Sequence, residues 1–294
     1  MAASTTAKAF NEFHDRIRLT DNQKQTVQAR RSNVNGYLTS AFGSSSDMPL
    51  VRSWVIGSGQ RDTMIRPLND IDMMAHFSNS GEVYERYKSD SRLFLYRVRD
   101  ALKRESTVKV VGARGQAVRF FYTDDLHVDV VPVIKWSSGG YALPSGNGKW
   151  LTTDPDFHHE YLKTKSKEVG GDLKQFSRAM KQWNRAHGSR LKSFHLEMLA
   201  ANVFSTLGNN SRTASQVFFA NAKNGLTIND PAGHSGDLSS YLDSSWSQRR
   251  QVVANMEEAE ERAKRANDAE AKGNHKEAIR LWRLVFGDEF PAYG

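Results

Sequence analysis

Apolar residues recur at helical spacing through the first forty residues of the chain. Phe10, Phe13 and Ile17 lie three and four positions apart, which predicts a helix over roughly residues 4–18. Thr20 or Asp21 can cap a second helix directly afterwards. The apolar face of this second helix carries Val27, Val34, Leu38 and Phe42, and the run Gly43-Ser44-Ser45-Ser46 ends it.

A β-rich region comes after these helices. Residues 50–56 and 70–77 are predicted strands, separated by a Gly-Ser-Gly turn, and residues 83–104 are predicted as one amphipathic helix. Three more strands are predicted over residues 107–112, 117–123 and 127–134, with Ala113-Arg114-Gly115-Gln116 as the hairpin turn between the first two. The turn-rich stretch SSGGYALPSGNGKW links this sheet to the C-terminal half of the chain.

From residue 154 onward the pattern is helical. Asp154 followed by Pro155 is typical of a helix start, and Gly170-Gly171 ends that helix. Further helices are predicted over residues 172–187, 193–206, 243–272 and 275–286. The sequence thus predicts an α+β protein, with a sheet lobe and N-terminal helices in residues 1–150 and a helical lobe in residues 151–294.

Composition narrows the class of protein. No apolar run approaches the roughly 18 residues that span a bilayer, and the N-terminus lacks a signal core, so we expect a cytoplasmic protein with no membrane partner. The absence of cysteine excludes disulfides, thiolate zinc sites and cysteine nucleophiles. A net charge of +8 suits a polyanionic partner, either nucleic acid or nucleoside triphosphates, but there is no block of five Lys/Arg residues that would indicate a nucleic-acid tail.

Three carboxylates form the candidate catalytic group. Asp70 and Asp72 are two apart on a predicted strand, so their side chains point to the same face. Asp129 lies in the apolar strand LHVDVVPVI, and a neighbouring strand can bring it beside the first pair. Clustered carboxylates need a cation between them, and hard oxygen ligands suit Mg²⁺. Three of them can hold two Mg²⁺ ions, with Mn²⁺ as the alternative, one activating an attacking hydroxyl and one steadying a triphosphate.

Each part of this group also has an ordinary structural explanation. Two aspartates on an exposed strand are common, and a buried Asp129 could be satisfied by a salt bridge. The occurrence of all three in order on predicted strands favours nucleotidyl transfer.

Candidate phosphate contacts occur on both sides of the carboxylates. Gly57-Ser58 follows a strand and opens a turn whose N–H groups, with the Ser58 hydroxyl, suit a phosphate. The helix predicted over residues 172–187 carries a basic stripe, which is either a solvated face or a phosphate-binding one; it consists of Lys174, Arg178, Lys181 and Arg185. Ser193, at the start of the next helix, is either an N-cap or a phosphate contact.

Several motifs together resemble a known family. GSGQRDTMIRPLNDIDMM followed by HVDVVPVI resembles the nucleotidyltransferase superfamily that includes DNA polymerase beta. KQWN, LKSFHLEML, INDPAGH and the ending EAIRLWRLVFGDEFP narrow the resemblance to the bacterial cGAS/DncV-like nucleotidyltransferases, or CD-NTases, of antiphage signalling. The opening helices also resemble theirs, so the likeness extends over nearly the whole chain.

This resemblance implies a palm-like sheet that holds two Mg²⁺ ions and a helical lobe that closes over nucleotides. Asp70, Asp72 and Asp129 would be the metal ligands and catalytic residues. Gly57 and Ser58 would hold a triphosphate, Lys181 and Ser193 would contact phosphates from the helical lobe, and Asp230 would lie near the acceptor nucleotide. Such enzymes join nucleoside triphosphates, ATP among them, into cyclic di- or trinucleotides and release pyrophosphate. A regulatory protein partner is compatible with this interpretation, and no nucleic acid is required.

Other functions remain open on the sequence alone. Template-independent tailing of RNA or tRNA uses the same carboxylates, and the charge of +8 mildly favours it, whereas the C-terminal motifs oppose it. A toxin that nucleotidylates tRNA or protein is a second alternative, although the minimal type is usually shorter. A nucleotide-binding module without activity ranks last, because all three acids are present.

Overall fold

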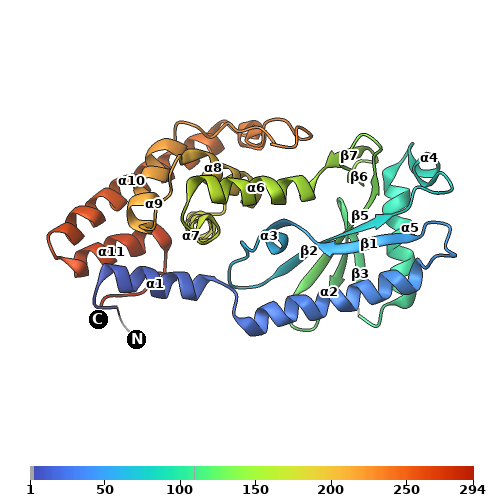
Figure 1. The fold of residues 1–294 in the computed structure, drawn as a ribbon, viewed down its shortest axis with the longest axis horizontal. Coiled ribbons are helices and arrows are strands. Elements are labelled where there is room, and N and C mark those ends of the chain that lie inside the picture. Colours follow the sequence, from blue (N-terminus) through green and yellow to red (C-terminus); the bar gives the residue numbers. More distant parts are fainter. Residues whose placement is uncertain (1–2, 109) are drawn as a thin grey trace. The chain divides into compact units, whose positions relative to one another are not determined.

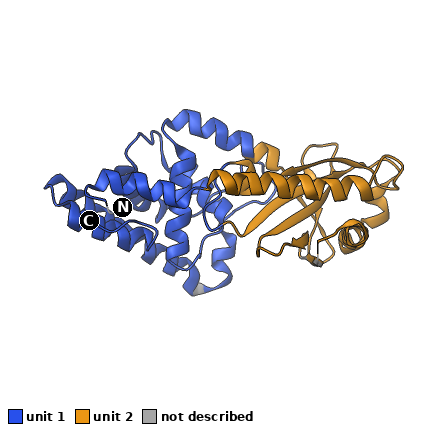
Figure 2. Cartoon of the chain, turned by 90° about the horizontal axis from the view of Figure 1, so that it is seen from below, with its two compact units in different colours: residues 1–18, 62–67, 159–294 blue, residues 19–61, 68–158 orange. Residues whose placement is uncertain are grey.

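The computed structural model describes residues 3–108 and 110–294, and the chain divides into two compact units (Figure 2). The sheet unit comprises residues 19–61 and 68–158, and the helical unit comprises residues 1–18, 62–67 and 159–294. This division differs from a single boundary at residue 150. The first helix and the short segment 62–67 belong to the helical unit, so the chain passes from one unit to the other at residues 18, 61, 67 and 158.

The sheet unit is built on one mixed sheet (Figure 1). The strands run in the order β1 (Leu50–Val55), β2 (Asp70–Phe77), β5 (His127–Lys135), β4 (Ala117–Phe121) and β3 (Val110–Arg114). β6 (Tyr141–Pro144) pairs with β5, and β7 (Trp150–Thr153) pairs with β6. β2 and β5 are parallel, whereas the other pairs are antiparallel. Residue 109, within the strand predicted over 107–112, lies outside the described residues.

Two helices of the sheet unit pack on one face of this sheet. α2 (Asp21–Ala41) begins at Thr20, which forms a capping box with Gln23. α2 and α5 (Ser91–Glu105) both contact the strands. Phe77 of β2 contacts Phe42 at the end of α2 and Phe94 of α5, with ring centroids 4.9 and 5.7 Å apart. Because side chains alternate along a strand, the even-numbered residues of β2 lie on the opposite face.

Two predictions for the sheet unit are wrong in detail. The helix predicted over residues 83–104 is two helices, α4 (Val83–Tyr87) and α5. Asp90 starts the second one, because its carboxylate accepts the N–H of Arg92 at 3.0 Å. The turn-rich stretch predicted as a linker contains β6 and lies against β7, which together form an antiparallel hairpin.

The helical unit consists of α1, most of α6 and the helices that follow. Their bounds are α1 (Thr6–Ile17), α6 (Pro155–Val169), α7 (Leu173–Ala186), α8 (Ser193–Val203), α9 (Ser211–Ala222), α10 (Trp246–Ala271) and α11 (His275–Phe286). α9 was not predicted from the sequence, and a 3₁₀ helix, Ser240–Ser244, precedes α10. Among the described residues, no helix has the length and apolar character needed to cross a bilayer.

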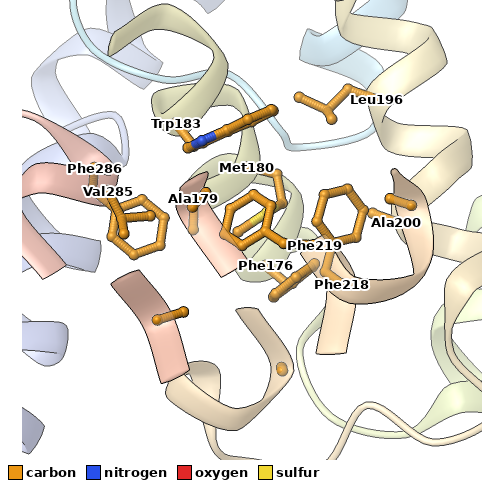
Figure 3. Close-up of a cluster of buried hydrophobic side chains, with 14 of the residues drawn as sticks. Phe176, Ala179, Met180, Trp183, Leu196, Ala200, Phe218, Phe219, Val285 and Phe286 are labelled. Carbon is orange, nitrogen blue, oxygen red and sulfur yellow. The ribbon is translucent and has the colours of Figure 1, made fainter. Parts of the chain in front are cut away.

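Aromatic side chains pack together with aliphatic ones in the core of the helical unit (Figure 3). Trp183 of α7 packs on Phe219 of α9, with ring centroids 5.0 Å apart. Phe13 of α1 packs on Phe286 of α11 in the same core, with ring centroids 4.6 Å apart. α1 is therefore fixed to the C-terminal helix, although the two are at opposite ends of the sequence. The α+β architecture predicted from the sequence is confirmed.

Candidate active site

Asp70, Asp72 and Asp129 lie on the sheet face opposite α2 and α5. β2 and β5 pair in a parallel register that sets Asp72 directly beside Asp129 and Asp70 beside His127. Neighbouring residues of paired strands share a face, so the three carboxylates project from the same side of the sheet. The strand pairing thus brings together acids that are 57 residues apart in sequence, from Asp72 to Asp129.

Asp72 has the most perturbed electrostatics of the three. Its pKa is raised from 3.8 to about 6, first by burial and then by the charges of Asp70 and Asp129. Arg61 and Arg119 act in the opposite direction, because a nearby cation favours the ionised carboxylate. The carboxylates therefore crowd one another, and a cation beside them would relieve the repulsion.

Arg119 is the immediate partner of Asp129. It lies opposite Asp129 in the antiparallel pairing of β4 and β5, and its guanidinium donates two hydrogen bonds of 2.6 Å to the two carboxylate oxygens. Such a two-point pair gives each oxygen of this largely buried carboxylate one charge-assisted hydrogen bond. Within residues 3–108 and 110–294, no three acidic or histidine side chains converge closely enough to hold a metal ion as they stand.

The sequence reasoning missed Arg119 and Arg61. Arg119 is the lone charged residue in the apolar strand Ala117–Phe121, and a lone charge of this kind signals a partner across the sheet. Arg61 directly follows the glycine-serine turn and is 7% exposed. Both cations lie close enough to affect the pKa of Asp72.

The glycine-serine turn forms a short helix, α3 (Gly57–Gln60), immediately after β1. Gly57 has φ +60°, and a Cβ there would lie 3.0 Å from the Asp72 carboxylate oxygen Oδ2. The N–H of Ile56 donates to the Asp72 carbonyl at 2.9 Å, which fixes the turn against β2. A side chain at position 57 would therefore be strained by the positive φ and would lie in tight contact with the Asp72 carboxylate. Ser58 comes directly afterwards, in the first turn of α3.

Lys181 lies in the helical unit and is 6% exposed. It forms an ion pair with Glu197 of α8, which is completely buried, and donates to the carbonyl and hydroxyl oxygens of Thr63 at 3.0 and 3.1 Å. The basic stripe of α7 is therefore not uniformly solvated, because this member points inward.

Ser193 and Asp230 also lie in the helical unit. Ser193 is exposed as the first residue of α8, and Lys192 occupies the cap position. The Tyr241 hydroxyl accepts the Lys192 N–H at 2.8 Å and contacts His195 Nδ1 at 3.0 Å, which fixes the start of α8. Asp230 is 4% exposed, and its carboxylate accepts N–H groups of its own loop, from Ala232, His234 and Ser235.

Comparisons with known proteins show which family the chain resembles in sequence. The model of the Second Messenger Oligonucleotide or Dinucleotide Synthetase domain matches residues 4–166. The "Probable cyclic nucleotide synthase" of Bacillus cereus is 28% identical over 81% of this chain and 81% of its own length. The "Cyclic AMP-AMP-AMP synthase" of an Acinetobacter species is 27% identical over 82% of this chain and 73% of its own.

A solved structure supports the same assignment at the level of the fold. The structure of Escherichia coli CdnC with ATP superimposes with a TM-score of 0.79 over 97% of this chain and 98% of that one, at 21% identity. The polymerase-beta-like nucleotidyltransferase fold predicted from the sequence is therefore confirmed. The chain belongs to the Second Messenger Oligonucleotide or Dinucleotide Synthetase family, and its predicted kinship with the bacterial CD-NTases is confirmed.

Proposed function

We propose that this chain is a metal-dependent synthase that joins ATP units, alone or with a second nucleotide, into a cyclic di- or trinucleotide and releases pyrophosphate. The observation that carries the proposal is the parallel register of β2 and β5, which sets Asp72 beside Asp129 on one face, with Asp70 in the same row. Family membership fixes the reaction class, and the ATP choice rests on the relatives: one is named a cyclic AMP-AMP-AMP synthase, and CdnC was solved with ATP.

The chemistry of the three side chains fits a pair of divalent cations. All three offer hard carboxylate oxygens. Burial and then the neighbouring negative charges raise the pKa of Asp72, and a divalent cation would favour its ionised form. Bound Mg²⁺ or Mn²⁺ would activate the attacking 3′ hydroxyl and neutralise charge on the triphosphate. Asp70, Asp72 and Asp129 would hold the cations. Because both oxygens of Asp129 accept hydrogen bonds from Arg119, Asp129 would have to bind a cation alongside Arg119 or break these hydrogen bonds.

The remaining parts of the site would bind the substrate. The amides at the start of α3 and the Ser58 hydroxyl would orient the donor triphosphate, because first-turn N–H groups lack acceptors within a helix. Ser193, exposed at the start of α8, is a further candidate phosphate contact. Asp230 stays a candidate residue near the acceptor nucleotide. Its carboxylate already accepts N–H groups of its own loop, so the loop rather than the carboxylate would contact that nucleotide.

The biological setting is inferred from the relatives. We propose that the protein works in the cytoplasm and that its product is a second messenger in antiphage defence. A second structure of the E. coli relative is a complex of CdnC with HORMA-deltaN, which supports a regulatory protein partner.

Product analysis tests the proposed function. The purified chain would be incubated with ATP alone and with all four ribonucleoside triphosphates, each with Mg²⁺ or Mn²⁺, and products would be treated with phosphatase before mass spectrometry. We expect a product with the mass of linked nucleoside monophosphates without free ends, and none after chelation of the metal. Linear products only, or activity that survives chelation, would contradict the proposal.

A further inference from the structure

Helix α8 begins with an exposed serine and without a capping side chain. Ser193 is its first residue, and Lys192 at the N-cap position makes no side-chain capping hydrogen bond. The first N–H groups of a helix have no acceptor within the helix, and a polar cap residue ordinarily accepts one of them. Asp172 and Asn210 are such caps for α7 and α9. The start of α8 is held instead through the backbone that precedes it.

Two polar side chains hold the two residues before Ser193. Asn184 of α7 accepts the Leu191 N–H at 3.0 Å and donates to the Leu191 carbonyl at 2.8 Å. The Tyr241 hydroxyl accepts the Lys192 N–H at 2.8 Å, and the Lys192 ammonium lies 4.5 Å from the centre of the Tyr241 ring. These contacts fix the chain up to Lys192 and leave Ser193 exposed.

The positions of the hydrogens in the Tyr241–His195 pair follow from their neighbours. His195 Nε2 lies 2.7 Å from the carbonyl oxygen of Leu226, which can only accept, so Nε2 carries a hydrogen. Burial lowers the pKa of His195 below its ordinary value, and the ring is therefore neutral. His195 Nδ1 must then accept the Tyr241 hydroxyl hydrogen, at 3.0 Å. The hydrogen bonds thus run in one direction, from the Lys192 N–H through Tyr241 and His195 to Leu226.

The same pair closes the loop that contains Asp230. Leu226 and Tyr241 lie at the two ends of this loop, and both are hydrogen-bonded to His195, which is 1% exposed. Within the loop, the Asp230 N–H donates to the Gly236 carbonyl at 2.7 Å. One buried histidine of α8 therefore ties the first turn of that helix to both ends of the Asp230 loop.

We infer that Tyr241 and His195 are positioning residues: they fix Ser193 and the first turn of α8 relative to the Asp230 loop, and so act on phosphate binding through Ser193. This inference rests on the proposed function, in which Ser193 is a phosphate contact. A pair that only stabilises the fold would affect nucleotide binding independently of Ser193. A positioning pair is energetically coupled to Ser193, and a double-variant cycle detects that coupling.

The test uses the full chain and variants that each remove defined hydrogen bonds. Tyr241→Phe removes the hydroxyl and keeps the ring beneath the Lys192 ammonium. His195→Asn can present an amide oxygen in place of Nδ1, whereas His195→Gln can present an amide nitrogen in place of Nε2, so the Asn variant alone keeps an acceptor for Tyr241. Tyr161→Phe is the matched control, because the Tyr161 hydroxyl donates to Asn202 at the other end of α8, at 2.9 Å.

Three quantities would be measured for each variant: the affinity for a non-hydrolysable ATP analogue with Mg²⁺, the amide hydrogen exchange of the first turn of α8, and the urea midpoint of unfolding. Ser193→Ala, alone and combined with Tyr241→Phe, completes the cycle. We expect Tyr241→Phe and His195→Gln to weaken analogue binding by about 3- to 10-fold, the value of one or two neutral hydrogen bonds. Exchange in the first turn should be faster in both.

His195→Asn should retain most of the affinity, and Tyr161→Phe should match the parent chain in binding and in exchange. The variant Ser193→Ala/Tyr241→Phe should bind no more weakly than the weaker single variant, because both changes disable the same contact. If a His195 variant has lost its fold, as shown by its urea midpoint, Tyr241→Phe and the cycle still decide.

Parent-like binding by Tyr241→Phe, or losses that multiply in the double variant, would overturn the inference. A parent chain that does not bind the analogue at all would instead contradict the proposed function. Hydrogen exchange would then still test the positioning, since equal rates in the first turn of α8 in the parent chain and in Tyr241→Phe would contradict it.

Discussion

Asp72 carries the electrostatic cost of the candidate site. It is largely buried, it lies beside Asp129 in the sheet, and Asp70 is two residues away on the same strand. Burial first, and then the charges of these two carboxylates, raise the pKa of Asp72 to about 6, whereas Arg61 and Arg119 offset only part of the effect. A group whose folded pKa lies above its unfolded value of 3.8 binds more protons when folded, so its ionisation destabilises the fold as pH rises.

The pH dependence of stability should show this directly. In metal-free protein, Asp72→Asn should be more stable than the parent chain at pH 7.5, by on the order of 2 kcal/mol. The difference should appear between pH 4 and about 6, the window between the unfolded and folded pKa values, and vanish below it. Urea denaturation at several pH values in the presence of chelator measures it. If the free energy of unfolding depends on pH in the same way in both proteins, ionisation of Asp72 does not destabilise the fold.

Activity should respond to each carboxylate. Asp70→Asn, Asp72→Asn and Asp129→Asn should each lower turnover by at least ~10²-fold, because each removes a ligand that would stabilise charge in the transition state. Circular dichroism should show an unchanged fold. Asp124→Asn, on an exposed acid of the same unit that pairs with Arg30, provides the control. Near-normal turnover in any of the three would remove that residue from the site.

The same residues show how far sequence reasoning reaches at this scale. The common face of Asp70 and Asp72 follows from the two-residue period of a strand, and the glycine-serine turn follows from composition. The pair formed by Arg119 and Asp129 depends on the register of two strands, which no local pattern specifies. Burial of Lys181 was equally out of reach, because its helical period fits a solvated face as well as an inward one.

At the scale of elements, segments with a strong hydrophobic periodicity were predicted correctly, whereas boundaries and strands with a weak one were missed. The predicted and observed bounds of β2 agree, and those of α11 agree as well, because each has an uninterrupted apolar face. The break at Asp90 was missed because apolar spacing continues across it, although Asp90 caps the second helix. β6 and β7 were missed because both are only four residues long and lie among turn-forming residues.

The contact between α1 and α11 should be a major source of stability for the helical unit. Phe13 is fully buried, and its ring centroid lies 4.6 Å from that of Phe286 and 5.2 Å from that of Phe290. Phe13→Ala should lower the free energy of unfolding of this unit by about 3–5 kcal/mol, because it leaves a cavity in an aromatic core. Leu284→Ala, a truncation on α11 that is 44% exposed, should change it by less than about 0.5 kcal/mol in urea denaturation. Equal effects of the two would contradict this packing.

At the scale of the whole molecule, the chain interleaves its two units. Only a contiguous division can be read from composition, whereas segment 62–67 and α1 join the helical unit through contacts with α7 and α11. The net charge of +8 is a property of this scale as well, and it left an RNA-extending enzyme open as an alternative. The sequence has no arginine-rich block that would hold a long phosphate backbone, and family membership favours a messenger synthase.

The central claim is that the enzyme joins mononucleotides to one another rather than extending RNA. The most direct measurement is the fate of α-labelled ATP, incubated with Mg²⁺ or Mn²⁺ with and without tRNA or an oligonucleotide, with Asp72→Asn as the inactive control. We predict a small product that resists phosphatase, forms without RNA, does not increase when RNA is added, and is absent with the Asp72→Asn variant. Label that enters only the added RNA, with no small cyclic product under either metal, would contradict the account.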